Sequence, residues 1–85
     1  MTRDRIYRLI DAERERQEQK FGGPHAHGSG SCASAGVPLA VKVAVLSEEC
    51  GEVARAFLDG NAAGLRDELI QVAAVAVAII EGEES

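Results

Sequence analysis

The feature that most constrains this chain is a short break, Asp59-Gly60-Asn61, between two long segments with helical periodicity. Glycine readily adopts the left-handed conformation that follows a helix end, and asparagine is a favourable N-cap for the next helix. The flanking segments, from about Pro38 to Leu58 and from about Ala62 to Glu81, are therefore predicted to be helices. So short a link makes the two helices antiparallel neighbours.

Another helix is predicted ahead of this hairpin. It runs from about Arg3 to Lys20, and Thr2 is placed to cap it. Residues 22–36 are dominated by Gly, Ser and Pro and show no period, so we expect a flexible loop there. The chain has 85 residues and no internal repeat. We therefore expect one all-α domain over residues 1–85, with three main helices.

The apolar pattern of the hairpin favours self-association. The second helix carries an expected core seam with four-three spacing, formed by Leu39, Val43, Leu46, Cys50, Val53 and Phe57. The third helix is apolar on nearly every side, with Leu65, Leu69, Val72, Ala76 and Ile79 in one row and Ile70, Val75, Val77 and Ile80 around it. Such a helix must be buried all round, which one hairpin and one further helix cannot achieve. We expect a homodimer or homotetramer that completes four-helix bundles.

Charge and composition narrow the range of partners. The net charge of −5 argues against nucleic-acid polymers, which are bound by basic surfaces, although a divalent cation can mediate binding of a small phosphate ligand. Cys32 and Cys50 stand in no metal-binding spacing. The N-terminal residues are charged, and the longest apolar stretch, Val72–Ile80, is far short of the ~20 residues that span a bilayer. We expect a cytoplasmic protein that has no membrane partner.

Polar side chains interrupt the packed faces of the hairpin at Glu48, Glu49, Glu52, Glu68 and Gln71. Counted from Gly60, Glu52 and Glu68 are each eight residues away, and Glu49 and Gln71 are each eleven away. In an antiparallel hairpin each pair then lies at one height, roughly 12 to 17 Å from the turn. Three carboxylates and one amide are therefore expected to converge.

Carboxylates gathered in this way repel one another unless a cation joins them. Oxygen ligands in this number suit Mg²⁺ or Mn²⁺ rather than zinc, so the sequence predicts a magnesium site. The competing interpretation is a solvated charged face. It suits Glu48 best, because Arg55 lies nearby on the same side of the helix.

The first helix and the loop hold further polar candidates. One face of the helix begins apolar and becomes polar, through Ile6, Ile10, Glu13, Gln17 and Lys20. Its second half either lines a polar cavity or leaves the core and is solvated. In the loop, His25 and His27 form an H-x-H pair that is able to bind a metal, but we expect both rings to face solvent.

The sequence resembles a known family in three segments. Ser47-Glu-Glu-Cys-Gly-Glu-Val-Ala-Arg-Ala-Phe, followed by Leu65-Arg-Asp-Glu-Leu-Ile-Gln-Val-Ala, is similar to the E-E-x-x-E and E-x-x-D motifs of the MazG-like all-α nucleoside triphosphate pyrophosphohydrolases. Glu13-Arg-Glu-Arg-Gln-Glu-Gln-Lys-Phe-Gly resembles the segment that precedes the motif in these proteins. The similarity covers most of the chain outside the Gly/Ser loop.

This resemblance implies an enzyme that cleaves nucleoside triphosphates to monophosphate and pyrophosphate. It implies Mg²⁺ held by Glu49, Glu52 and Glu68, with Glu48 orienting or deprotonating the attacking water. The fourth ligand of the family is usually aspartate, and Gln71 stands there instead, with an amide oxygen that carries no charge. Candidates for the remaining substrate contacts are Lys20, Lys42 and Arg66 at the phosphates and Gln17 and Phe21 at the base.

A second hypothesis belongs to another class of protein. The chain could be a non-catalytic helical oligomer that keeps the fold and binds a nucleotide or a cation. The neutral Gln71 favours this alternative, and a turnover assay separates the two. The sequence does not indicate the preferred base or sugar.

Overall fold

The computed structural model describes residues 1–84 and confirms the expected all-α character. It contains three helices and one very short β-hairpin, at α1 Arg3–Phe21, β1 Pro24–His25, β2 Gly28–Ser29, α2 Leu39–Leu58 and α3 Ala62–Glu84. The two strands pair antiparallel within the loop that joins α1 to α2. The structure differs from expectation mainly in this hairpin and in α3, which continues three residues past Glu81.

Local capping explains where the helices begin and end. The Thr2 hydroxyl oxygen accepts a hydrogen bond from the Arg5 backbone N–H at 3.2 Å, which caps α1 as expected. Gly60 adopts a φ of 68°, the left-handed conformation that turns the chain after α2. The Asn61 side-chain oxygen accepts from the Gly64 backbone N–H at 2.9 Å and so caps α3.

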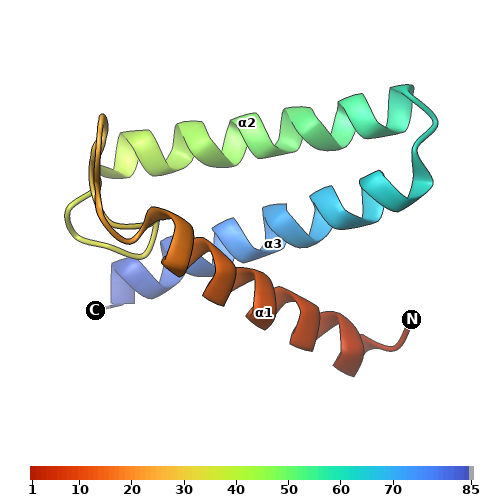
Figure 1. Cartoon of the computed structure of the whole chain (residues 1–85), viewed down its shortest axis with the longest axis horizontal. Coiled ribbons are helices and arrows are strands. Elements are labelled where there is room, and N and C mark those ends of the chain that lie inside the picture. The colour runs from red at the N-terminus through yellow and green to blue at the C-terminus, as the bar shows by residue number, and fades with distance from the viewer. Residues whose placement is uncertain (85) are drawn as a thin grey trace.

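Helix α3 is the central element. It runs antiparallel to α2, and α1 crosses it at an angle, with the long loop carrying the chain from the end of α1 to the start of α2 (Figure 1). Both α1 and α2 pack against α3, whereas α1 and α2 make little contact with each other. Helices α1 and α2 therefore pack side by side on α3 without packing closely against each other.

The apolar core of the single chain is small. Its buried apolar side chains among the described residues are Val37, Ala56, Ala74, Val75 and Ala78. Three of these five come from α3, and alanine there lets the neighbouring helices approach closely. A core built from so few and such small side chains supports only modest stability.

The prediction that the four-three seam of α2 forms the core is wrong for a single chain. Leu39, Val43 and Cys50 are exposed, and Phe57 is 71% exposed. The row that faces α3 instead carries Lys42, Val45, Glu49, Val53 and Ala56, none of which is exposed. Both rows have helical spacing, and the chain packs the one that contains the charged residues. Of the expected apolar row, Leu46 and Val53 are partly buried and the other four remain on the surface, together with Leu69 and Ile80 of α3.

Across residues 1–84, none of the helices combines the length and the apolar character that a bilayer crossing requires.

Candidate functional site

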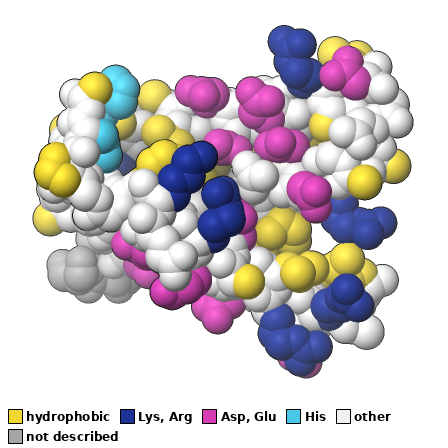
Figure 2. Space-filling model, in the orientation of Figure 1, with side chains coloured by type: hydrophobic (Ala, Val, Ile, Leu, Met, Phe, Trp, Pro, Cys, Tyr) yellow, Lys and Arg dark blue, Asp and Glu magenta, His cyan; other side chains and the backbone are white. Residues whose placement is uncertain are grey.

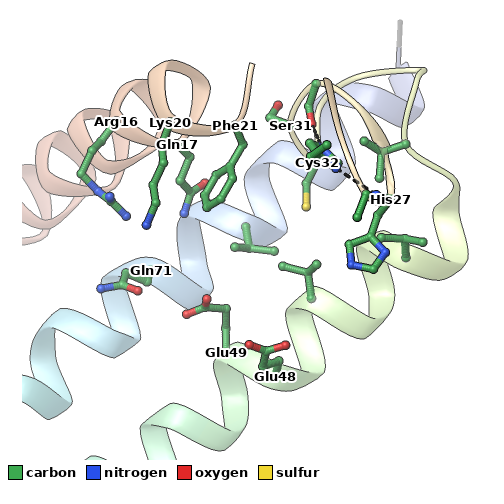
Figure 3. Close-up of a pocket in the computed structure, with 17 residues that line it drawn as sticks. Arg16, Gln17, Lys20, Phe21, His27, Ser31, Cys32, Glu48, Glu49 and Gln71 are labelled. Atoms are coloured by element: carbon green, nitrogen blue, oxygen red, sulfur yellow. Dashed lines mark hydrogen bonds between the residues drawn. The ribbon is translucent and has the colours of Figure 1, made fainter. Parts of the chain in front are cut away.

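A cavity of about 420 Å³ lies between α1, the loop and α2, with α3 as its floor. Its polar and aromatic lining comes from Arg16, Gln17, Lys20, Phe21, His25, His27, Ser31, Cys32, Glu48, Glu49 and Gln71. Figure 3 shows the labelled side chains of α1 pointing across the cavity toward Gln71, Glu48 and Glu49. The cavity therefore joins residues from every helix of the chain.

The polar half of the α1 face lines this cavity. Gln17 is only 8% exposed, and its amide nitrogen donates to the Glu13 carboxylate at 3.2 Å. The Lys20 ammonium lies 5.1 Å from the centroid of the Phe21 ring, within the range of a cation–π contact. Of the two alternatives for this face, the structure supports the cavity.

The carboxylates beneath α1 lack partners. Glu49 and Glu68 each have one carboxylate oxygen, Oε2, that is buried and makes no hydrogen bond. Burial raises the pKa of the Glu49 carboxyl, and the charges of Glu68, Glu48, Glu52 and Glu13 raise it further. Acidic side chains gather on this face over the middle of α2 and between α2 and α3, with basic side chains beside them (Figure 2). Positive charge placed at Glu49 and Glu68 would relieve an unfavourable arrangement.

The expected ligand set is only partly assembled. Glu49 and Gln71 line the cavity, Glu68 is half-buried next to it, and Glu52 is exposed. Among the side chains of residues 1–83, no three acidic, histidine or cysteine groups are close enough together to enclose a metal ion. Mg²⁺, however, is usually held by one or two carboxylates, with water and substrate phosphates completing its shell. The unpaired oxygens of Glu49 and Glu68 fit that mode of binding.

A second cavity of about 410 Å³ opens between α1 and α3. Arg16 and Gln71 line both cavities, so the two spaces adjoin there. The second cavity also holds Arg66, one of the expected phosphate contacts, and Glu13. Arg16 was not anticipated as a site residue, although its position next to Gln17 on the polar half of α1 was a usable signal.

Lys42, another expected phosphate contact, lines neither cavity. Its side chain is buried, with 4% of the residue exposed. Its ammonium lies beside Gly82 near the end of α3, 3.0 Å from the position that a Cβ atom would take on that glycine. The last turn of a helix carries partial negative charge, which stabilises a cation. Lys42 therefore fixes the start of α2 against the end of α3 instead of reaching a ligand in the cavity.

The loop is attached to the helices through Arg14, whose side chain is 9% exposed. Its guanidinium donates two hydrogen bonds to Glu81 of α3, each of 3.1 Å, and one to Glu18 at 2.9 Å. The Ser31 hydroxyl donates to the same Glu18 carboxylate. The hydrogen bond from Ser31 and the Arg14 guanidinium lower the pKa of Glu18, and Arg14 lowers the pKa of Glu81. This network holds Ser31 and its neighbour Cys32 at the cavity wall.

The two histidines have different environments. His25 Nε2 bonds to the Gly30 carbonyl at 2.7 Å, and His25 Nδ1 accepts from the His27 backbone N–H at 3.2 Å. These contacts assign His25 the neutral form protonated at Nε2, a structural role in the hairpin. Both residues are exposed, as expected, yet both also line the cavity mouth.

Sequence reasoning missed the loop's contribution to the cavity. Cys32 and Ser31 reach its wall only because the loop folds back on α1, which no periodic pattern signals. Burial raises the pKa of the Cys32 thiol, so this side chain lines the wall as a neutral group.

Three comparisons with known proteins gave no match: none of the family models, curated proteins or solved structures searched matches this chain.

Proposed function

We propose that this protein hydrolyses nucleoside triphosphates to monophosphate and pyrophosphate with the help of Mg²⁺ or Mn²⁺. The observation that carries the proposal is the pair of buried, unpaired carboxylate oxygens of Glu49 and Glu68 beside a cavity that also holds Lys20 and Phe21. Unpaired anionic oxygens next to cationic and aromatic groups suit a ligand that carries a cation, phosphates and a flat base. The resemblance of both hairpin motifs to MazG-like enzymes supports the same reaction.

The residues of the cavity divide naturally between the parts of such a substrate. Phe21 offers an aromatic face to the base, and the Gln17 amide is close enough to the same wall to hydrogen-bond a base edge. Lys20 and Arg16 present positive charge toward the phosphates. The cation, held by Glu49 and Glu68, would neutralise charge on the phosphate oxygens.

Glu48 is the proposed general base. It lines the cavity and is exposed, so it can meet a water molecule beside the bound phosphates. The water oxygen forms a bond to the α-phosphorus, its proton passes to the Glu48 carboxylate, and the bond from the α-phosphorus to the bridging oxygen breaks. Pyrophosphate leaves with the electron pair of that bond.

The test is a screen of ribo- and deoxyribonucleoside triphosphates with Mg²⁺ and with Mn²⁺. Monophosphate and pyrophosphate are the expected products, without release of single phosphate. Glu48→Gln should retain cation binding and lower turnover by about 10²-fold or more, because only the proton acceptor is lost. Glu15→Gln on the exposed side of α1 is the matched control and should keep full turnover.

The second candidate is a non-catalytic protein that binds the same ligands. The neutral Gln71 and the exposed Glu52 favour it, because both reduce the charge gathered around a cation. Nucleotide binding without product, in the parent and in Gln71→Asp alike, would support this candidate and exclude the enzyme.

Self-association is part of the proposal. The exposed row of Leu39, Val43 and Phe57 and the incompletely covered α3 are expected to be buried by a second copy that completes a four-helix bundle. Phe57→Ser should shift the protein toward monomer in analytical ultracentrifugation. A stable, folded monomer of the parent at micromolar concentration would contradict this part.

A further inference from the structure

Glu13 brings a carboxylate from α1 to the region where the carboxylates of the hairpin meet. Its side chain is only 13% exposed, and it lines the second cavity together with Gln71. Its charge acts on Glu49, as do the charges of the hairpin carboxylates. Each helix therefore contributes one partly buried carboxylate to this region: Glu13 from α1, Glu49 from α2 and Glu68 from α3.

In the protein without a ligand, the Arg16 guanidinium is the positively charged group that is hydrogen-bonded to a carboxylate of this region. Its Nε donates to Glu13 Oε1 at 2.8 Å, and its Nη2 donates to Glu13 Oε2 at 2.6 Å. The Glu13 hydrogen bonds raise the pKa of Arg16, and the charge of Glu49 adds to the effect. Arg16 nevertheless leaves Glu49 Oε2 and Glu68 Oε2 without a hydrogen bond. One guanidinium is thus bound to one carboxylate of the three.

We propose that Glu13 supplies to the divalent cation the carboxylate that α3 lacks at Gln71, and that Arg16 releases Glu13 when the cation binds. The inference rests on the proposed function, because it concerns the same cation. The two N–H groups of Arg16 occupy both oxygens of Glu13. Because Glu13 is held in this way, the carboxylates lie in one region but do not enclose an ion in the apo protein. A divalent charge competes for Glu13 more strongly than a half-exposed guanidinium does. The released Arg16 remains at the junction of the two cavities, where it faces substrate phosphates.

The first test measures Mg²⁺ and Mn²⁺ binding by calorimetry and by thermal melting, without nucleotide. Glu13→Gln should weaken binding by about tenfold, because the number of charged ligands tunes cation affinity. Glu15→Gln makes the same chemical change on the exposed side of α1 and should bind as the parent does. Adding Gln71→Asp to Glu13→Gln should restore affinity to within about threefold of the parent, because the missing charge returns from α3.

A second variant, which is expected to increase Mg²⁺ affinity, keeps the inference testable if Glu13→Gln fails to fold. Arg16→Gln removes the competing cation and should tighten Mg²⁺ binding several-fold, more than Arg8→Gln, which lowers the net charge equally from an exposed site on the same helix. Equal effects of Arg16→Gln and Arg8→Gln would overturn the inference. Parent-like binding by Glu13→Gln, with binding lost in Glu49→Gln, would overturn it and leave the proposed function standing. A parent that binds neither cation would overturn both.

Discussion

Two clusters of carboxylates lie along α1, and they differ in their counter-charges. At the end near the loop, Glu18 and Glu81 share the buried Arg14 guanidinium, and their pKa values are lowered. Toward the middle of the hairpin, Glu49 and Glu68 each keep a buried oxygen without a partner, and the pKa of Glu49 is raised. In the first cluster both carboxylates have their counter-charge within the chain, although Arg14 Nη1 is buried without a hydrogen-bond partner, and the cluster holds the loop in place. The second is complete only when a positive ligand is added.

The largest effect is expected from breaking the cluster around Arg14. Arg14→Met keeps the packing of the side-chain stem but removes the ion pairs to Glu18 and Glu81, and should lower the free energy of unfolding by about 2 to 3 kcal/mol; Glu18 then keeps only its hydrogen bond from Ser31. The cost stays below that of a fully buried pair because both carboxylates are partly exposed and regain water. Urea denaturation measures it. Arg8→Met breaks the exposed pair with Asp4 and, as the control, should cost less than about 0.5 kcal/mol. Equal costs for the two variants would contradict the difference drawn between the pairs.

An added carboxylate in the cluster of Glu49 and Glu68 should lower the stability of the protein without a divalent cation but should not lower it when the cation is bound. Gln71→Asp adds a carboxylate near Glu49 and should lower the free energy of unfolding by about 1 kcal/mol in EDTA, through like-charge repulsion. With saturating Mg²⁺ the same variant should equal or exceed the parent, since the cation now has another charged ligand. Thermal melting in both conditions tests this. A loss of stability that Mg²⁺ does not reverse would show that position 71 is not next to a cation.

The pH dependence should also separate the two clusters. A carboxyl whose pKa is raised on folding, as at Glu49, makes the protein less stable as pH rises from its ordinary value of 4.5 through the raised value. Glu18 and Glu81, whose pKa values are lowered, contribute stability above 4.5 that is lost as pH falls through their folded values.

This difference predicts a small effect with a defined sign. In EDTA, the melting temperature of Glu49→Gln should exceed that of the parent by an amount that grows as pH rises above 4.5, and should approach that of the parent below it. A gap that shrinks with rising pH would mean that Glu49 is stabilised as an anion and has a partner in the apo protein.

Much of the fold could be predicted because its signals are local. Thr2, Gly60 and Asn61 act within a few residues of their own positions, so the sequence indicates the helix ends. The face that α2 turns toward α3 could not be predicted in the same way. Two rows on α2 have helical spacing, and the more apolar one lies at the surface of the single chain. The preference depends on which face of α2 packs against α3, and the periodicity of α2 alone does not encode that choice.

The candidate site likewise contains residues that local helix spacing predicts and residues that only tertiary packing brings there. Glu49 and Gln71 were expected at one height of the hairpin, and both line the cavity. The positions of Glu13 and Arg16 at the second cavity, and of Lys42 outside both cavities, depend on the angle at which α1 crosses α3 and on the packing of α2 against the end of α3. Those are tertiary relations between segments far apart in the sequence.

The most direct test of the contrast between the clusters is calorimetric titration with Mg²⁺ of the parent, Glu49→Gln and Glu81→Gln at neutral pH. The three proteins allow the same loss of one carboxylate to be compared at the two sites. The account predicts that the parent and Glu81→Gln bind Mg²⁺ alike and that Glu49→Gln loses most of this binding, because of these two glutamates it is Glu49 that keeps a buried oxygen without a hydrogen-bond partner. Equal Mg²⁺ affinity in all three proteins, or no binding by the parent, would contradict it.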